Sequence, residues 1–318
     1  MVGDSVLVTG GSGFIGRHLV QQLSKRGYKV RVLVRRVPPA GFGQAVEVVV
    51  GDLTKPESYA SALAGATAIV HAALTGGLSG DLEVAETLGK LSAQAGVRKF
   101  IHLSSIAVYG NPSDGNITED TRPIPASDAY SRTKLAIEER LQASSEIPEV
   151  VILRLGCVYG PGPGWWTHGL LSMMERGQLI MVNGGTGTAN LIHVADIAAI
   201  VLLLIERSNP AFDIWNVTDG MPVTWSRYFS ELEKILGRSA TISMTVAEAQ
   251  QYGKHWLRPS LMRRAIRKLM GGRRIHPLDD RAIEGFASRA VFSNQKASTT
   301  LAFTPTYDLD AGMRTVAR

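Results

Sequence analysis

A tyrosine and a lysine stand four residues apart in a helical pattern over residues 129–143, with Ser127 or Asp128 placed to cap it. Residues at i and i+4 share one face of a helix, so Tyr130 and Lys134 project together. A phenol titrates near ~10 in isolation, and a neighbouring ammonium favours the phenolate. We therefore predict that Lys134 lowers the pKa of Tyr130, which then acts as a general acid or base. The alternative is an exposed tyrosine beside a solvated lysine.

Two serines follow an apolar strand-like run at residues 99–103. In open α/β sheets, ligands bind at the carboxyl edge of the strands, which is where Ser104 and Ser105 should lie. A hydroxyl group at this edge can hydrogen-bond a substrate carbonyl or alcohol and orient it toward Tyr130. The alternative is a serine pair that only caps backbone at the end of the strand.

A glycine cluster follows the first apolar run of the chain, and an amphipathic helical pattern begins directly after it. The cluster fits G-x-x-G-x-x-G from Gly10 and G-x-G-x-x-G from Gly11, so the loop alone does not name an enzyme class. Glycines permit the tight turn and let a pyrophosphate touch bare backbone at the helix N-terminus. We predict a dinucleotide site, rather than a purely structural turn, at Gly10, Gly13, Phe14, Ile15 and Gly16. Lys134 could then hold the ribose hydroxyls of a nicotinamide cofactor.

Strand and helix patterns alternate through the first half of the chain. Strand-like runs lie at residues 5–8, 29–34, 46–50, 68–71, 99–103 and 150–155, and helical patterns at 16–26, 56–63, 82–95 and 129–143. Such alternation predicts an α/β fold, a Rossmann-like doubly wound parallel sheet with helices on both faces. We expect residues 1–160 to form a dinucleotide-binding domain that takes back about 189–220, including a strand at 212–217. Residues 161–318 should mostly form a smaller substrate-binding domain.

Several further motifs appear in a familiar order. They are Gly51-Asp52-Leu53, His71-Ala72-Ala73, Leu103-Ser104-Ser105 with Val108-Tyr109-Gly110, Arg154 to Gly162, and Ile192-His193-Val194-Ala195-Asp196. With the glycine turn and Tyr130-x-x-x-Lys134, they resemble the extended short-chain dehydrogenase/reductase family. The resemblance implies a nicotinamide cofactor and hydride transfer at a carbinol or ketone.

The resemblance also assigns roles to individual residues. It implies that Ser105 is the catalytic serine, with Ser104 beside it, and that Asp52 and Leu53 touch the adenine. It further implies that Ala72 and Ala73 line the diphosphate and ribose, and that Val108 and Asn190 lie at the substrate.

Departures from the family pattern narrow the substrate. Ile106 and Ala107 stand where sugar-nucleotide dehydratases carry an Asp-Glu pair, and neither can move a proton. Ala189 and Asn190 replace the Arg-Asp pair of sugar-nucleotide epimerases, which removes a bidentate phosphate contact. The C-terminal segments 292–297 and 301–305 resemble the 3β-hydroxysteroid dehydrogenase branch. Trp165, Trp166, Met173 and Met174 either wall an apolar pocket or belong to the core.

The charge pattern after the glycine turn bears on the cofactor. An NAD site usually has a carboxylate about 20 residues beyond the glycines, yet residues 17–46 contain no Asp or Glu. The second strand-like run is instead followed by Arg35 and Arg36, which suit a 2′-phosphate. We predict that NADP(H) is preferred, with NAD(H) as the alternative, and no metal.

The chain has 318 residues, a net charge of +6 and one cysteine, Cys157. A single cysteine without a leader-like segment favours a reducing compartment, so we expect a cytoplasmic protein. Residues 258–274 hold seven basic residues and no acid, so the rest is near neutral and a general nucleic-acid binder is not expected. This basic amphipathic helix could meet a membrane surface, an acyl carrier or an anionic substrate, or could be a solvated lid. A homodimer is also left open.

Together these patterns predict an NADP(H)-dependent ketone reductase, or the reverse alcohol dehydrogenase, with a fairly apolar substrate. Tyr130 would transfer the proton, Lys134 would tune it, and Ser105 would align the substrate oxygen, with help from Ser104. One alternative is a sugar or sugar-nucleotide epimerase of the same family, which retains its cofactor. Another is a cofactor-sensing protein without chemistry.

Overall fold

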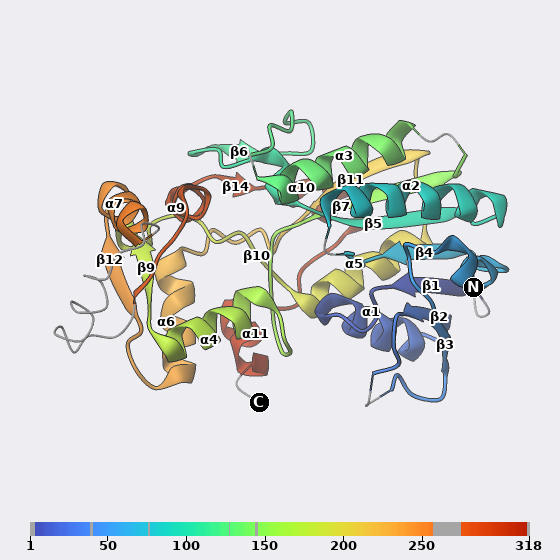
Figure 1. Cartoon of the computed structure of the whole chain (residues 1–318), viewed down its shortest axis with the longest axis horizontal. Helices are drawn as coiled ribbons and strands as arrows, with labels where there is room; N and C mark the ends of the chain where they lie inside the picture. The colour runs from blue at the N-terminus through green and yellow to red at the C-terminus, as the bar shows by residue number, and fades with distance from the viewer. Residues whose placement is uncertain are drawn as a thin grey trace.

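A seven-stranded sheet forms the centre of the computed structural model, which describes residues 4–38, 41–75, 77–126, 128–143, 146–256 and 275–316. The strand order is β11-β7-β5-β4-β1-β2-β3, and every neighbouring pair is parallel (Figure 1). The strands are β1 (Ser5–Thr9), β2 (Lys29–Val34), β3 (Val46–Val50), β4 (Ala68–His71), β5 (Lys99–Ser105), β7 (Glu149–Leu155) and β11 (Phe212–Val217). The predicted Rossmann-like fold is confirmed, and the strand at 212–217 joins the main sheet as expected.

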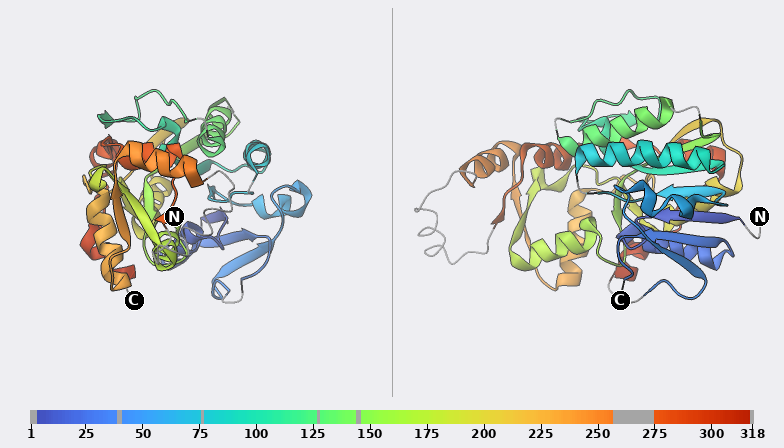
Figure 2. Two further views of the ribbon diagram at one scale, coloured as in Figure 1. Left: turned by 60° about the vertical axis from the view of Figure 1, so that its left-hand side comes forward. Right: turned by 45° about the vertical axis from the view of Figure 1, so that its right-hand side comes forward.

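Helices cover both faces of this sheet, as parallel strands joined by crossovers require. Alternate residues of the strands face α1 (Phe14–Lys25) and α5 (Val194–Glu206) on one side, among them Val8 and Ile101. The residues between them, such as Leu7 and Phe100, face α2 (Leu78–Gln94) and α3 (Ala129–Ala143) on the other. Figure 2 shows α2 and α3 side by side across one face.

Element boundaries differ from the sequence prediction in places. Helix α1 begins two residues before the predicted residue 16, and α2 begins four before residue 82. The helix predicted at 56–63 is two short 3₁₀ turns, η1 (Pro56–Ser58) and η2 (Ala60–Leu63). They are separated at Tyr59, whose backbone leaves the helical region at φ −136° and whose side chain is fully buried.

The sheet order changes direction between β1 and β4, which are neighbours in the sheet but not in the chain. Because the loops after these strands lead to opposite sides, a crevice opens at their carboxyl ends, where ligands bind in such folds. The glycine turn follows β1, and Ser105 ends β5 at the same edge. The fold therefore brings the predicted cofactor and catalytic residues to one edge.

A second group of elements lies beyond this carboxyl edge, on the left in Figure 1. It contains a three-stranded parallel sheet of order β12-β9-β13, made of Thr241–Met244, Gln178–Val182 and Ile275–His276. The helices are α4 (Leu170–Arg176), α6 (Trp225–Leu236), α7 (Val246–Trp256) and α9 (Asp280–Ala287). The predicted basic helix at 258–274 lies outside the described residues. No helix among those described is both long and apolar enough to cross a bilayer.

Two short strand pairs connect this group to the main sheet. Strand β8 (Cys157–Tyr159) pairs with β10 (Leu191–His193), and β6 (Asn116–Ile117) pairs with β14 (Val291–Phe292). The chain then continues into α10 (Gln295–Leu301), which packs on β11, and α11 (Leu309–Val316). These ties fix the substrate side of the molecule against the loop that follows Ser105.

Candidate active site

Tyr130 and Ser105 meet at the carboxyl edge of the sheet. Tyr130 lies in the first turn of α3, which Asp128 caps by accepting a hydrogen bond from the Ser131 amide at 2.9 Å. Ser127, the other predicted cap, lies outside the described residues. Ser105 ends β5, accepts from the Ala107 amide at 3.2 Å and lies close enough to the Tyr130 phenol for its hydroxyl to lower the pKa of that phenol. The predicted pairing of serine and tyrosine is therefore present.

The predicted effect of Lys134 on Tyr130 is wrong. Burial raises the pKa of the Tyr130 phenol, while the Ser105 hydroxyl and the charge of Arg281 lower it. The Lys134 ammonium instead donates to the Leu103 carbonyl at 2.7 Å. Burial lowers the pKa of Lys134 to about 8, although the carboxylates of Asp81 and Glu138 raise it. Lys134 lines the pocket with its ammonium on this backbone carbonyl, and it is not among the charges that shift the pKa of Tyr130.

Two histidines lie close enough to Lys134 for its charge to act on them. His71 and His102 are partners on β4 and β5, with stacked rings 5.4 Å apart. Burial, and secondly Lys134, lowers the pKa of His71 to about 3 and that of His102 well below its usual value. Both rings are therefore neutral near pH 7. The described residues form no cluster of three or more side chains suited to a metal.

The Ser104 hydroxyl is bound to a buried ion pair, not free to help orient the substrate as predicted. Successive strand residues point to opposite faces, so Ser104 turns away from the side of Ser105. Its hydroxyl donates to Glu138 of α3, which pairs with Arg154 of β7 at 2.6 Å, both side chains being 3% exposed. Arg154 also donates to the Tyr109 hydroxyl at 2.7 Å. This network fastens the helix carrying Tyr130 and Lys134 to the sheet.

The glycine turn has the shape that a dinucleotide requires. Gly10 has φ +70°, and a Cβ there would lie 2.8 Å from backbone atoms of Ala72 and Ala73. A Cβ on Gly16 would overlap the Gly10 carbonyl and lie 2.7 Å from the Gly11 Cα. No described side chain caps the N-terminus of α1 at Gly13, so its first amides face the crevice. These residues fit a pyrophosphate, and Phe14 and Ile15 contribute side chains to the adjoining pocket.

The residues predicted for the adenosine half lie beyond this turn. Arg35 and Arg36 are exposed directly after β2. The Asp52 carboxylate accepts from the Thr54 amide and hydroxyl, and these bonds, together with more distant Lys55 and Arg35, hold its pKa low. Leu53 beside it is half-buried. This arrangement leaves two cations near the end of β2, and their role stays a prediction.

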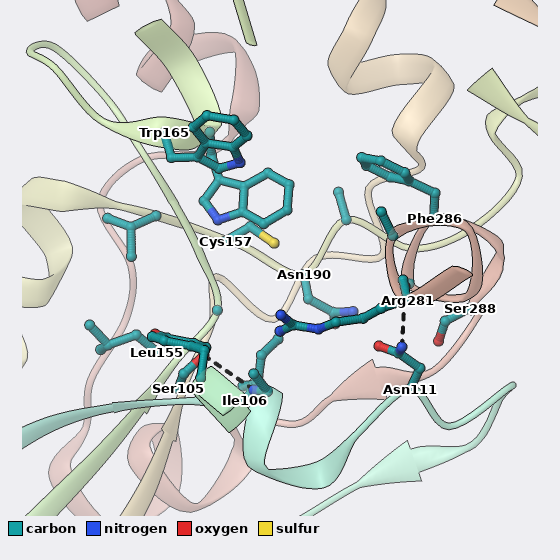
Figure 3. A pocket seen from close by; sticks show the side chains of 18 of the residues that line it. Ser105, Ile106, Asn111, Leu155, Cys157, Trp165, Asn190, Arg281, Phe286 and Ser288 are labelled. Carbon is teal, nitrogen blue, oxygen red and sulfur yellow. Dashed lines mark hydrogen bonds between the residues drawn. The ribbon is translucent and has the colours of Figure 1, made fainter. Parts of the chain in front are cut away.

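A largely apolar cavity of about 710 Å³ opens from Ser105 and Tyr130, a size typical of small-molecule sites (Figure 3). Trp165 and Trp166, in a π-helical turn at Trp165–Gly169, line it together with Met173. This agrees with the predicted alternative in which these side chains wall an apolar pocket. Met174 is fully buried in the core instead. The Phe14 ring lines this cavity and packs against Gly162 and Gly164.

Two predicted substrate residues have structural roles. Val108 is wholly buried in a small core cluster with Tyr109 and Phe292, because the 3₁₀ turn after Ser105 points it inward, so its assignment to the substrate is wrong. Asn190 lines the cavity with φ +47°, but its amide donates to the Ala290 carbonyl at 3.0 Å and accepts from the Phe292 amide at 2.9 Å. Its side chain therefore ties β10 to β14.

Sequence patterns missed the residues that α9 contributes to the cavity. Arg281 and Phe286 line it, and Arg281 pairs with Asp128 at 2.9 Å. Cys157, the one cysteine of the chain, also lines the wall, and burial raises the pKa of its thiol. These residues come from segments far from Tyr130 in the sequence. Only an unusual charge in an apolar amphipathic helix could have signalled Arg281.

Comparisons with known proteins agree with this geometry. Residues 6–218 match the model of the NAD dependent epimerase/dehydratase family. Ceramide reductase of Caulobacter vibrioides is 34% identical over 233 residues, 68% of each chain. A 3-beta-hydroxysteroid dehydrogenase of Mycolicibacterium neoaurum is 26% identical, covering 97% of this chain and 89% of that one. UDP-glucuronic acid 4-epimerase from Bacillus cereus, solved with UDP-glucuronic acid and NAD, superposes with a TM-score of 0.74 at 23% identity over 98% of both chains.

Proposed function

The chain belongs to the NAD-dependent epimerase/dehydratase family of extended short-chain dehydrogenases/reductases, and from this premise we propose that it is an NADP(H)-dependent ketone reductase. In the reverse direction it would oxidise the secondary alcohol. The observation that carries the proposal is the largely apolar cavity that Ser105 and Tyr130 both line. The ceramide reductase and hydroxysteroid dehydrogenase relatives support an apolar substrate by their names. The family and its named relatives are dehydrogenases, reductases and epimerases, which favours an enzyme over a sensing protein without chemistry.

Each of three side chains in this pocket has its own role in ketone reduction. The bound nicotinamide would supply the hydride. Ser105 donates a hydrogen bond to the ketone oxygen and holds it beside the phenol. Tyr130 donates the proton, since a phenol is protonated at neutral pH. Lys134, which lines the same pocket, would hold the ribose hydroxyls of the cofactor.

The preference for NADP(H) rests on charge. Two exposed arginines, Arg35 and Arg36, follow β2, and neither Asp nor Glu occurs from residue 17 to residue 46. A 2′-phosphate would find cations there, while an NAD ribose would lack its usual carboxylate partner.

The test is turnover of a panel of apolar ketones with NADPH, followed by loss of the cofactor absorbance. Tyr130→Phe removes the proton donor, so turnover should disappear while NADPH still binds. Tyr28→Phe is the matched control, because the Tyr28 hydroxyl makes only a 3.4 Å contact with Glu206, away from the pocket. Near-normal turnover by Tyr130→Phe would refute the assignment.

A sugar-nucleotide epimerase is the second candidate, because Arg281 gives the cavity a cation that could contact a phosphate. Against it, the fully buried Ala189 and the fully occupied Asn190 amide replace the phosphate-binding pair expected of such enzymes. Conversion of a UDP-sugar without net consumption of cofactor would favour the epimerase. Stoichiometric loss of NADPH with a simple ketone would favour the reductase.

A further inference from the structure

A charged side chain, Arg281, stands in the largely apolar wall of the pocket. Arg281, in the first turn of α9, pairs with Asp128, the cap of α3, at 2.9 Å. Figure 3 shows the Arg281 side chain reaching from α9 across the cavity toward Ile106. The two ends of the pair thus come from the substrate side and from the catalytic helix.

The described residues do not satisfy all the hydrogen-bond donors and acceptors of this ion pair. A guanidinium has five N–H donors, and the side-chain partner that the described residues give Arg281 is Asp128. The Arg281 side chain is 39% exposed, on the cavity side. The Asp128 oxygen in the pair also accepts from the Ser131 amide, and its second oxygen is buried with no partner in the described part of the chain. Donors facing an apolar cavity favour a ligand that carries an acceptor.

Arg281 also lies close to the reacting groups. Its charge lowers the pKa of the Tyr130 phenol, and its partner Asp128 precedes Tyr130 by two residues. A group held by Arg281 would therefore sit beside the carbonyl that Ser105 and Tyr130 hold.

Three other polar side chains of the wall are already engaged. The Asn190 amide is bound to the backbone of Ala290 and Phe292. Asn111 donates to the Arg281 carbonyl at 3.2 Å, and the Ser288 hydroxyl donates to the Pro112 carbonyl at 2.5 Å. Arg281 is therefore the charged donor that this wall offers to a substrate, and the indole N–H of Trp225 is a second, neutral donor without a partner in the described part of the chain.

We propose that Arg281 binds an oxygen acceptor, such as an amide carbonyl or a carboxylate, that the substrate carries next to its ketone. The apolar remainder of the substrate would lie along Trp165, Trp166 and Phe286. This inference rests on the proposed reductase function and narrows its substrate to apolar molecules with a second oxygen function near the ketone.

The experiment compares 3-oxododecanamide, 3-oxododecanoate and dodecan-3-one with NADPH, measuring kcat and KM for each. Comparing the amide with the carboxylate shows which of these two groups Arg281 binds. The variants are Arg281→Met, which removes the donors, and Arg281→Lys, which keeps the charge without the fork. Arg289→Met is the control, because the Arg289 side chain is exposed and its ion pair with Asp114 is long, at 3.9 Å. The ratio of kcat/KM between two substrates is taken within one preparation, so a partly folded variant does not distort it.

We expect the unsubstituted enzyme to favour at least one of the two acceptor-bearing ketones over dodecan-3-one by about 10- to 100-fold, the usual worth of a hydrogen bond to a charged group. Arg281→Met should bring this ratio near one, chiefly through KM, Arg281→Lys should fall between, and Arg289→Met should match the unsubstituted enzyme. Equal loss on all three substrates, or no preference in the unsubstituted enzyme, would overturn the inference alone. Failure of the unsubstituted enzyme to reduce any of the three would overturn the reductase proposal as well.

Discussion

Replacing Gly16 with alanine tests whether the glycine turn is built for a cofactor. Inside a helix this change normally stabilises by up to about 1 kcal/mol. At Gly16 the new methyl group would overlap the Gly10 carbonyl and lie 2.7 Å from the Gly11 Cα, where ordinary contact begins at 3.4 Å. Both neighbours are backbone, so α1 must move away by roughly 0.7 Å or more. Overpacking of this kind costs about 1–3 kcal/mol, so we expect a net loss of stability.

The same shift should weaken cofactor binding more than it weakens the fold. The first amides of α1 would no longer meet a pyrophosphate held at the turn, and each hydrogen bond to a charged group is worth about 1.5–3 kcal/mol. Losing one or two such bonds predicts an NADPH affinity lower by at least about tenfold. Urea unfolding and thermal unfolding with and without NADPH measure the two effects separately.

Gly89→Ala in α2 supplies the matched control. A Cβ there would meet Leu141 and Ile147 at 3.7 and 3.8 Å, which is ordinary packing. We expect this variant to gain up to about 1 kcal/mol and to bind NADPH as before. If Gly16→Ala were as stable as Gly89→Ala and bound NADPH equally well, the argument from close backbone approach would be wrong.

Three further predictions concern charge. Replacing Arg35 and Arg36 with serine should lower kcat/KM for NADPH relative to NADH by about tenfold or more, and an unchanged ratio would remove the 2′-phosphate assignment. The pKa of Lys134 is lowered to about 8, so the ammonium proposed to hold the cofactor ribose is lost as pH rises through that value, and kcat/KM for NADPH should fall there. Lys134→Arg, which stays charged, should remove that fall from the pH profile of kcat/KM for NADPH. Glu138→Gln should cost about 3–5 kcal/mol in urea unfolding because it leaves Arg154 buried and unpaired, and a loss below about 1 kcal/mol would contradict this account.

Local sequence patterns predicted much of the fold. The strand run at 150–153 is apolar and rich in β-branched residues, and strands of that kind form where both faces of a sheet are covered. The glycine turn and the pair Tyr130 and Lys134 were also visible, because their chemistry depends on spacings of a few residues. The 56–63 segment failed as a helix because it is only a few residues long and must place Tyr59 in the core.

Contacts between distant segments were beyond such patterns. Nothing near Lys134 reveals that the Leu103 carbonyl takes its ammonium, and nothing near Ser104 reveals the Glu138 and Arg154 pair. Val108 was misassigned because a 3₁₀ turn, unlike a strand, sends it into the core. Each error concerns the direction of a side chain that tertiary packing decides.

The Phe14 ring belongs to the helix that begins at the glycine turn, yet it lines the cavity and rests on Gly162 and Gly164. The ring therefore links the start of this helix to the wall of the cavity. A cofactor that shifts the start of α1 on binding would carry the ring with it and change the surface offered to a substrate, and thermodynamic reciprocity makes the two affinities depend on each other equally. Trimming the ring to alanine would remove this link, so binding of the first ligand would cease to alter the affinity for the second.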